Sequence, residues 1–217
     1  NGNAITIRDS LFDNNSAASG GAIQFYADLT TTNKFENIDI INSNFTNNRA
    51  TANSADVSDN VGGSAINFLS VSDVDIDNCR FEDNVANAKG ALRFVKFSDI
   101  YYNACKFNNN NATHGGAIYY QGLSTYVRGN STYNKCSFDN NYATANGGAI
   151  FTLGNDVTIR ESNFTNNHAD AWAGGIQMGD AAANFVTANL IITKSRFINN
   201  YAADAGAVDA YGTSDVR

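Results

Sequence analysis

The chain has 217 residues, a formal net charge of −7 and no proline. The acidic balance argues against binding nucleic acid or anionic lipid, and no apolar run approaches the ~18 residues that cross a membrane. Asn accounts for 34 residues. Because Asn is unfavourable in helices and open strands, this composition indicates many turns or stacked side-chain amides.

A seven-fold internal repeat organises the sequence, and its clearest copy is CKFNNNNATHGGAI at residues 105–118. Each copy has a Phe, an Asn three positions later and an Ala five positions later. The successive Phe residues are 33, 36, 26, 31, 26 and 33 positions apart, so a core of about 26 residues carries variable insertions. The two main columns are Phe12, Phe45, Phe81, Phe107, Phe138, Phe164 and Phe197, and Asn15, Asn48, Asn84, Asn110, Asn141, Asn167 and Asn200.

Each repeat contains three short segments in which apolar and polar residues alternate, which predicts strands. In the first repeat, Ile5 and Ile7 lie in one segment, Phe12 in the next, and Ile23 and Phe25 in a third that follows the glycine motif GGAI. The same order of three segments recurs in each of the following repeats, up to the seventh. Strands of ~3–5 residues cannot bury a face alone, so neighbouring repeats must cover one another.

These patterns predict an all-β fold, a right-handed parallel β-helix of about seven coils with three short strands each. We expect residues 1–217 to form a single domain that is a fragment of a longer repeat protein. Like residues then stack along the axis, and the Asn amides bond from coil to coil. An antiparallel sandwich is the alternative, but it needs hairpin signals and gives no register-locked columns.

A column of Ser and Cys lies two positions before each Phe and contains all three cysteines, Cys79, Cys105 and Cys136. Stacked coils place such side chains in parallel, which disfavours a disulfide. We therefore predict buried free thiols. His114 and His168 occupy different columns and are interpreted as turn residues.

The repeat, with FxxN followed by GGA and an aliphatic residue, resembles the repeats of the chlamydial polymorphic membrane proteins. The stretch VTIRESNFTNNHADAWAGGI from Val157 is also similar to Asn-rich adhesin-like surface proteins of methanogenic archaea. Both resemblances imply a right-handed parallel β-helix on the cell surface. Neither supplies a catalytic motif.

Alternation after the glycine turn predicts an outward apolar patch that binds a protein or stacks on a sugar. The alternative is that the long loops 27–37, 122–130 and 179–189 fold over it. A second candidate contact is an aromatic residue in a turn just before Gly174. The patch and this turn residue are Leu69, Val95, Tyr119, Phe151, Leu153 and Trp172.

An acidic cluster is the other outward feature. Asp73 and Asp99 stand at equivalent turn positions of adjacent coils, and Asp39 and Asp75 share a strand column. Carboxylates on neighbouring coils can hold Ca²⁺ or share a proton. The alternative is a solvated acidic face, and we predict no cofactor.

The sequence favours a non-enzymatic, extracellular adhesin segment that presents loops and an outward face to a protein or glycan partner on another cell. One alternative is a β-helix that binds or cleaves polysaccharide, and another is a spacer without binding activity.

Overall fold

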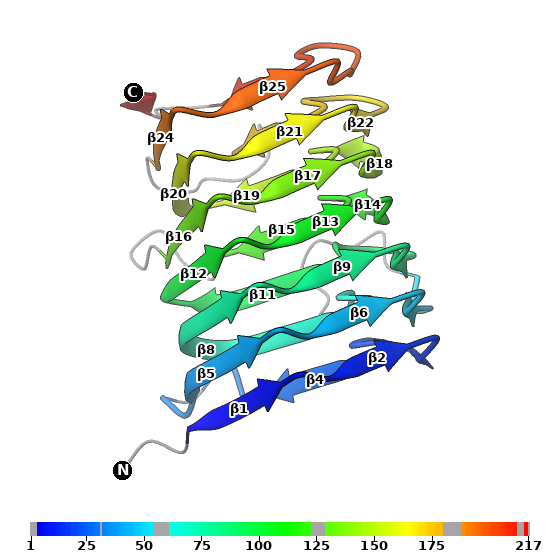
Figure 1. Ribbon diagram of the computed structural model, residues 1–217, viewed down its shortest axis with the longest axis vertical. Helices are drawn as coiled ribbons and strands as arrows, with labels where there is room; N and C mark the ends of the chain where they lie inside the picture. The colour runs from blue at the N-terminus through cyan, green and yellow to red at the C-terminus, as the bar shows by residue number, and fades with distance from the viewer. Residues whose placement is uncertain are drawn as a thin grey trace.

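The chain forms a parallel β-helix in a computed structural model that describes residues 4–30, 32–53, 61–122, 129–179, 188–211 and 215–216. In Figure 1 the front strands run from left to right, the chain returns behind them, and each turn rises by one level. The coil is therefore right-handed, as predicted from the sequence. All strand pairs within the three sheets are parallel, which excludes the antiparallel sandwich.

Each coil has three walls, and the first six coils have one additional short strand. The first wall contains β1 (Ile5–Arg8), β5 (Phe35–Ile41), the second half of β8 (Ile66–Asp77), β12 (Asp99–Asn103), β16 (Gly129–Asn134), β20 (Asn155–Arg160), β24 (Asn189–Thr193) and β27 (Asp215–Val216). The second wall contains β2 (Leu11–Asp13), β6 (Asn44–Thr46), β9 (Arg80–Glu82), β13 (Lys106–Asn108), β17 (Ser137–Asp139), β21 (Asn163–Thr165) and β25 (Arg196–Ile198).

The chain then passes through the short strands β3 (Ser16–Ala17), β7 (Arg49–Ala50), β10 (Val85–Ala86), β14 (Asn111–His114), β18 (Tyr142–Asn146) and β22 (His168–Ala169). The third wall contains β4 (Ile23–Tyr26), the first half of β8, β11 (Leu92–Phe97), β15 (Ile118–Gln121), β19 (Ile150–Leu153), β23 (Ile176–Met178) and β26 (Val208–Ala210). The short strands carry the Ala column and form a sheet of their own, which the sequence pattern did not separate from the turns.

The Phe column forms one continuous stack inside the second wall. Consecutive rings have centroids 4.5 to 5.0 Å apart and are tilted by only 3 to 9°. The parallel register pairs each Phe with the next one, so the coil spacing sets the ring spacing. The interior is filled by this stack and by the Ile and Val columns of the first wall, including Ile38, Val74 and Ile76.

The Asn column forms a hydrogen-bonded ladder at the corner that follows the second wall. In each coil the backbone N–H and the Nδ2 of one Asn donate to the Oδ1 of the next, over 2.9 to 3.2 Å. Each Nδ2 from Asn48 onward also donates to the carbonyl of the Phe one coil earlier. The amide thus joins three coils and satisfies buried backbone groups that the corner removes from the sheets.

The glycine turn allows neighbouring coils to approach closely. A Cβ on Gly116 would meet the backbone carbonyl oxygens of Gly148 and Tyr142 in the next coil. Gly115 has a φ of +61°, which L residues rarely adopt. These two requirements explain why the double glycine recurs in the repeat.

The three cysteines are free and buried, as predicted. They replace Ser in a column where several side chains accept from the backbone N–H of the preceding coil, as in the 3.4 Å contact from Ser43 N to Cys79 Sγ. Burial raises the pKa of the Cys79 thiol to about 11. A hydrogen bond with the Cys136 thiol and burial raise the pKa of Cys105 well above its ordinary value.

We expect none of the three thiols to react with Ellman's reagent at pH 8 in the folded protein, because the thiolate is the reactive form and the thiols are inaccessible. All three should react in denaturing urea. Rapid reaction of even one thiol in the folded protein would show that the Ser/Cys column is open to solvent.

A tyrosine network crosses the core between the first and third walls. The hydroxyl of Tyr120 lies 2.7 Å from that of Tyr102 and 2.8 Å from that of Tyr133. Burial raises the pKa of all three phenols well above the ordinary value. In the described part of the chain no helix is long and apolar enough to cross a membrane.

Candidate functional site

The outward apolar patch predicted on the third wall is not exposed, so that prediction is wrong. Its five members are between 0 and 4% exposed, and Tyr119 stacks on Phe151 with ring centroids 5.4 Å apart. Lys89 Nζ lies 5.5 Å from the centre of the Tyr119 ring. Alternation fixes the side of the wall that a side chain takes, but not whether other parts of the chain pack on it. The buried members are Leu69, Val95, Tyr119, Phe151 and Leu153.

The first of the long loops does contact the third wall. Ser70 Oγ donates to the carbonyl of Asn33 over 2.8 Å, and Lys96 Nζ donates to the carbonyl of Leu29 over 3.0 Å. The contacts of this loop agree with the alternative given in the sequence analysis, in which the long loops fold over the third wall. The other two loops fall mainly outside the described residues, at 123–128 and 180–187.

The outer face of the first wall is open to solvent along several coils. Its central outward column is in register from coil to coil, and Asp75 pairs with Tyr101, which pairs with Thr132. Tyr101 is 41% exposed and Ile191 is 38% exposed. The complete column is Thr6, Asp39, Asp75, Tyr101, Thr132, Thr158 and Ile191.

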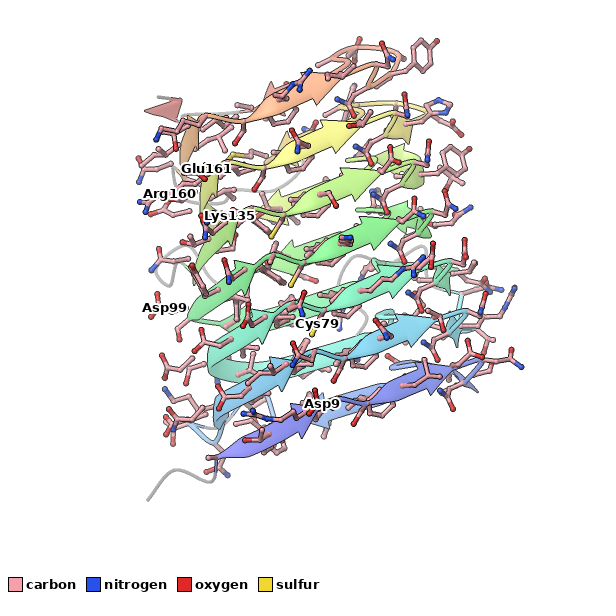
Figure 2. The ribbon with its side chains drawn as sticks, viewed as in Figure 1. Asp9, Cys79, Asp99, Lys135, Arg160 and Glu161 are labelled. Atoms are coloured by element: carbon pink, nitrogen blue, oxygen red, sulfur yellow. The ribbon has the colours of Figure 1, made fainter. Side chains whose placement is uncertain are left out.

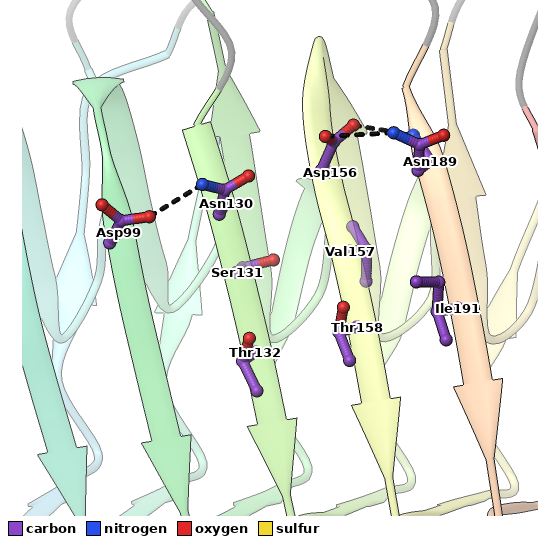
Figure 3. A pocket seen from close by; sticks show the side chains of 9 residues that line it. All are labelled: Asp99, Asn130, Ser131, Thr132, Asp156, Val157, Thr158, Asn189 and Ile191. Atoms are coloured by element: carbon purple, nitrogen blue, oxygen red, sulfur yellow. Dashed lines mark hydrogen bonds between the residues drawn. The ribbon is translucent and has the colours of Figure 1, made fainter.

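A groove of about 530 Å³ lies on this face, across β12, β16, β20 and β24 (Figure 3). One rim consists of carboxylate and amide side chains at the start of each strand. Asn130 Nδ2 donates to Asp99 Oδ1 over 2.7 Å, and the backbone N–H and Nδ2 of Asn189 donate to Asp156 over 2.7 and 3.2 Å.

The remaining lining is less polar. Thr132 and Thr158 present hydroxyl groups that make no hydrogen bond within the described residues, and Ile191 adds an apolar end. A surface with hydroxyl, amide and carboxylate groups beside an exposed aromatic ring can bind hydroxylated or peptide-like ligands.

The four predicted acidic residues lie on this same face. Register pairs Asp39 with Asp75, and the pairing of Val74 with Ile100 places Asp99 beside the position of Asp73. Desolvation, followed by the charges of Asp39, Asp73 and Asp77, raises the pKa of Asp75. Within the described ranges, no three His, Cys, Asp or Glu side chains are grouped so that they could hold a metal ion.

The raised pKa of Asp75 predicts a pH-dependent effect of Asp75→Asn. A carboxyl whose pKa is raised by folding stabilises the protein fully below its unfolded pKa, and this contribution is lost as pH rises through the folded pKa. Asp75→Asn should therefore increase Tm at pH 7, and the increase should shrink as pH falls below the raised pKa. Scanning calorimetry of both proteins across this range measures the difference.

The matched control for that experiment is Asp204→Asn, which changes an exposed carboxylate on the last coil. Its effect on Tm should be small at every pH. A decrease in Tm for Asp75→Asn at pH 7, or a gain independent of pH, would contradict the interpretation of the acidic cluster as mutually repulsive.

Three further residues lie in surroundings that the sequence did not predict. Trp172 is partly buried and its backbone bridges to Asn146, so its role in partner binding stays a prediction. His114 and His168 lie in strands rather than turns. The His168 ring lies between Tyr142, which it meets at a tilted angle, and Tyr201, which it meets edge-on. The sequence did not predict this partly exposed aromatic corner, because His and Tyr share one column.

Three segments match the repeat of the Chlamydia polymorphic membrane protein family: residues 9–26, 104–121 and 135–153. Each match starts at the corner before the second wall and ends in the third wall. The resemblance noted in the sequence is thus confirmed for the coil-forming unit. All residues that line the groove on the first wall lie outside the matched segments. No curated protein and no solved structure matches the chain.

Proposed function

We propose that this chain is a segment of an adhesin-like protein, secreted or on the cell surface, that binds a protein or glycan on another cell without catalysing a reaction. The similarity of three coils to repeats of a polymorphic membrane protein family supports the surface location. The observation that carries the binding role is the open groove on the first wall beside the exposed Tyr101. On the third wall, in contrast, the five members of the predicted apolar patch are buried.

The arrangement of the groove supports binding without catalysis. Its two carboxylates, Asp99 and Asp156, belong to coils that are separated by another coil, and each is held by a neighbouring Asn amide. These pairs make a fixed polar rim. Such a rim suits recognition of a ligand's hydroxyl or amide groups.

Beads coated with the chain should bind to a panel of epithelial and microbial cells more strongly than beads coated with albumin. Tyr101→Ser should reduce this binding several-fold, because an exposed aromatic side chain supplies much of the contact energy at a polar surface. The matched control is Tyr26→Ser, which removes a Tyr that is 60% exposed on the third wall. Equal binding of coated and albumin beads would contradict the proposal and favour a spacer.

The second candidate is a β-helix that binds or cleaves polysaccharide, and the acidic neighbours of Tyr101 favour it. Asp75 lies next to Tyr101 in register and its pKa is raised, as expected of a proton donor in a glycosidase-type reaction. Release of reducing ends from a polysaccharide panel, abolished by Asp75→Ala, would favour the enzyme over the adhesin.

A further inference from the structure

The edge between the first and second walls carries a row of positive side chains. Three adjacent columns meet at this edge, and register places one or more cations in each of the last five coils. All of them are exposed. Figure 2 shows Lys135 and Arg160 on this edge in neighbouring coils. The row, which we call the basic edge, consists of Arg80, Lys106, Lys135, Arg160, Lys194 and Arg196.

The basic edge is unusual for a chain with a net charge of −7. The same three columns contain only Asp9, Asp77 and Glu161 as acids, and Asp77 already accepts from Asn103 Nδ2 over 2.8 Å. Glu82 and Asp139 flank the edge on the second wall. The edge is therefore locally cationic, beside an acidic first wall.

Few of these cations are neutralised within the protein. Arg80 pairs with Glu82, and Lys194 lies 4.0 Å from Glu161. In the described part of the chain, no ion pair involves the other members, which are Lys106, Lys135, Arg160 and Arg196. Like charges on neighbouring strands destabilise a sheet. The fold does not require them, because the same columns hold Asn44, Ser137 and Asn163 in other coils.

A hollow of about 280 Å³ interrupts the edge between the third and fourth coils. Asn78 Nδ2 donates to Asn42 Oδ1 over 2.9 Å. The next residue in this column is Ala104, which has no side-chain amide, so this exposed row of amide hydrogen bonds ends at Asn78. Arg80 and Lys106 line the hollow from adjacent coils. The space left by the short Ala104 side chain can admit an anionic group between two cations.

We propose that the basic edge binds a linear anionic polysaccharide, with sulfate or carboxylate groups lying along the row and one entering the hollow. The cations repeat with the coil, at ~4.8 Å, and a polymer with charged groups on successive sugars presents a comparable single row of anions. Double-stranded DNA carries one charge per ~1.7 Å, which exceeds what one row can neutralise, and the neighbouring acidic wall repels the excess. The basic edge is a second binding surface of the proposed adhesin. Polymer binding itself does not depend on the proposed function, which supplies only the biological purpose of the binding.

The test measures binding of fluorescent dextran sulfate and of polygalacturonate to the full chain at low salt, with neutral dextran as the reference polymer. Lys106→Gln combined with Lys135→Gln should weaken binding of the preferred polymer about fivefold. The matched control is Lys34→Gln combined with Arg49→Gln, which removes two exposed cations elsewhere and changes net charge equally. This control should leave binding within about twofold of the parent chain.

The two anionic polymers distinguish sulfate from carboxylate as the recognised group. Binding of neither polymer above neutral dextran, or equal weakening by both double variants, would overturn the proposal. Equally tight binding of a DNA duplex would also overturn it, because the edge would then respond to charge alone. None of these outcomes changes the Tyr101-dependent binding of beads to cells. Failure of the basic-edge proposal can therefore be distinguished from failure of the proposed function. Thermal unfolding confirms that each double variant is folded.

Discussion

Asn110→Ala should destabilise the protein by about 4 kcal/mol, because it leaves several buried polar groups without partners. The Asn110 side chain donates to Asn141 Oδ1 and to the carbonyl of Phe81 over 3.0 and 2.9 Å. It also accepts from the backbone and side chain of Asn84. Alanine restores none of these bonds, and the site is fully buried. Urea unfolding followed by circular dichroism measures the change.

The control for the ladder is Asn44→Ala. Asn44 is exposed on the second wall, so its replacement should cost less than about 0.5 kcal/mol. If Asn110→Ala is as mild as this control, the amide ladder does not stabilise the fold.

Phe107→Ala should have an effect of similar size, about 3–5 kcal/mol, because it opens a cavity in the middle of the ring stack. The Phe107 ring is 1% exposed, and its centroid lies 4.9 Å from that of Phe81 and 4.7 Å from that of Phe138. Both stacking contacts are lost together. Urea unfolding of the variant again supplies the measurement.

Leu11→Ala is the matched truncation for the Phe stack. Leu11 is 67% exposed on the same wall, and we expect a change below about 0.5 kcal/mol. Equal effects for Phe107→Ala and Leu11→Ala would mean that the stack does not form the core.

The coil could be predicted from the sequence because each column repeats in fixed register. Phe107, Asn110 and Cys105 have counterparts at the same offsets in every copy, and parallel stacking turns those offsets into contacts. The Tyr102–Tyr120–Tyr133 network could not be predicted in this way. It joins the first wall to the third wall across the interior, at a distance that no repeat offset encodes.

The candidate site was only partly visible in the sequence. Asp73 and Asp99 were identified as equivalent positions, but the same column continues through Asn130, Asp156 and Asn189 to form the groove rim. All five lie six residues before the Ser/Cys column. A search for acidic residues alone does not detect this shared position, because Asn130 and Asn189 are amides. The prediction of an exposed patch around Tyr119 was wrong for a different reason. Alternation shows which side of the wall a side chain takes, but it carries no information about residues that pack on the wall from outside.

In-register hydrogen bonding of the Asn side chains is what holds the coils together in this fold. Hydrogen exchange of side-chain amides, followed by NMR, tests it most directly because each Nδ2 group has its own signal. We predict that the Nδ2 protons of Asn84, Asn110 and Asn141 exchange far more slowly than those of the exposed Asn44. Exchange of the ladder amides as fast as that of Asn44 would contradict the stacked arrangement.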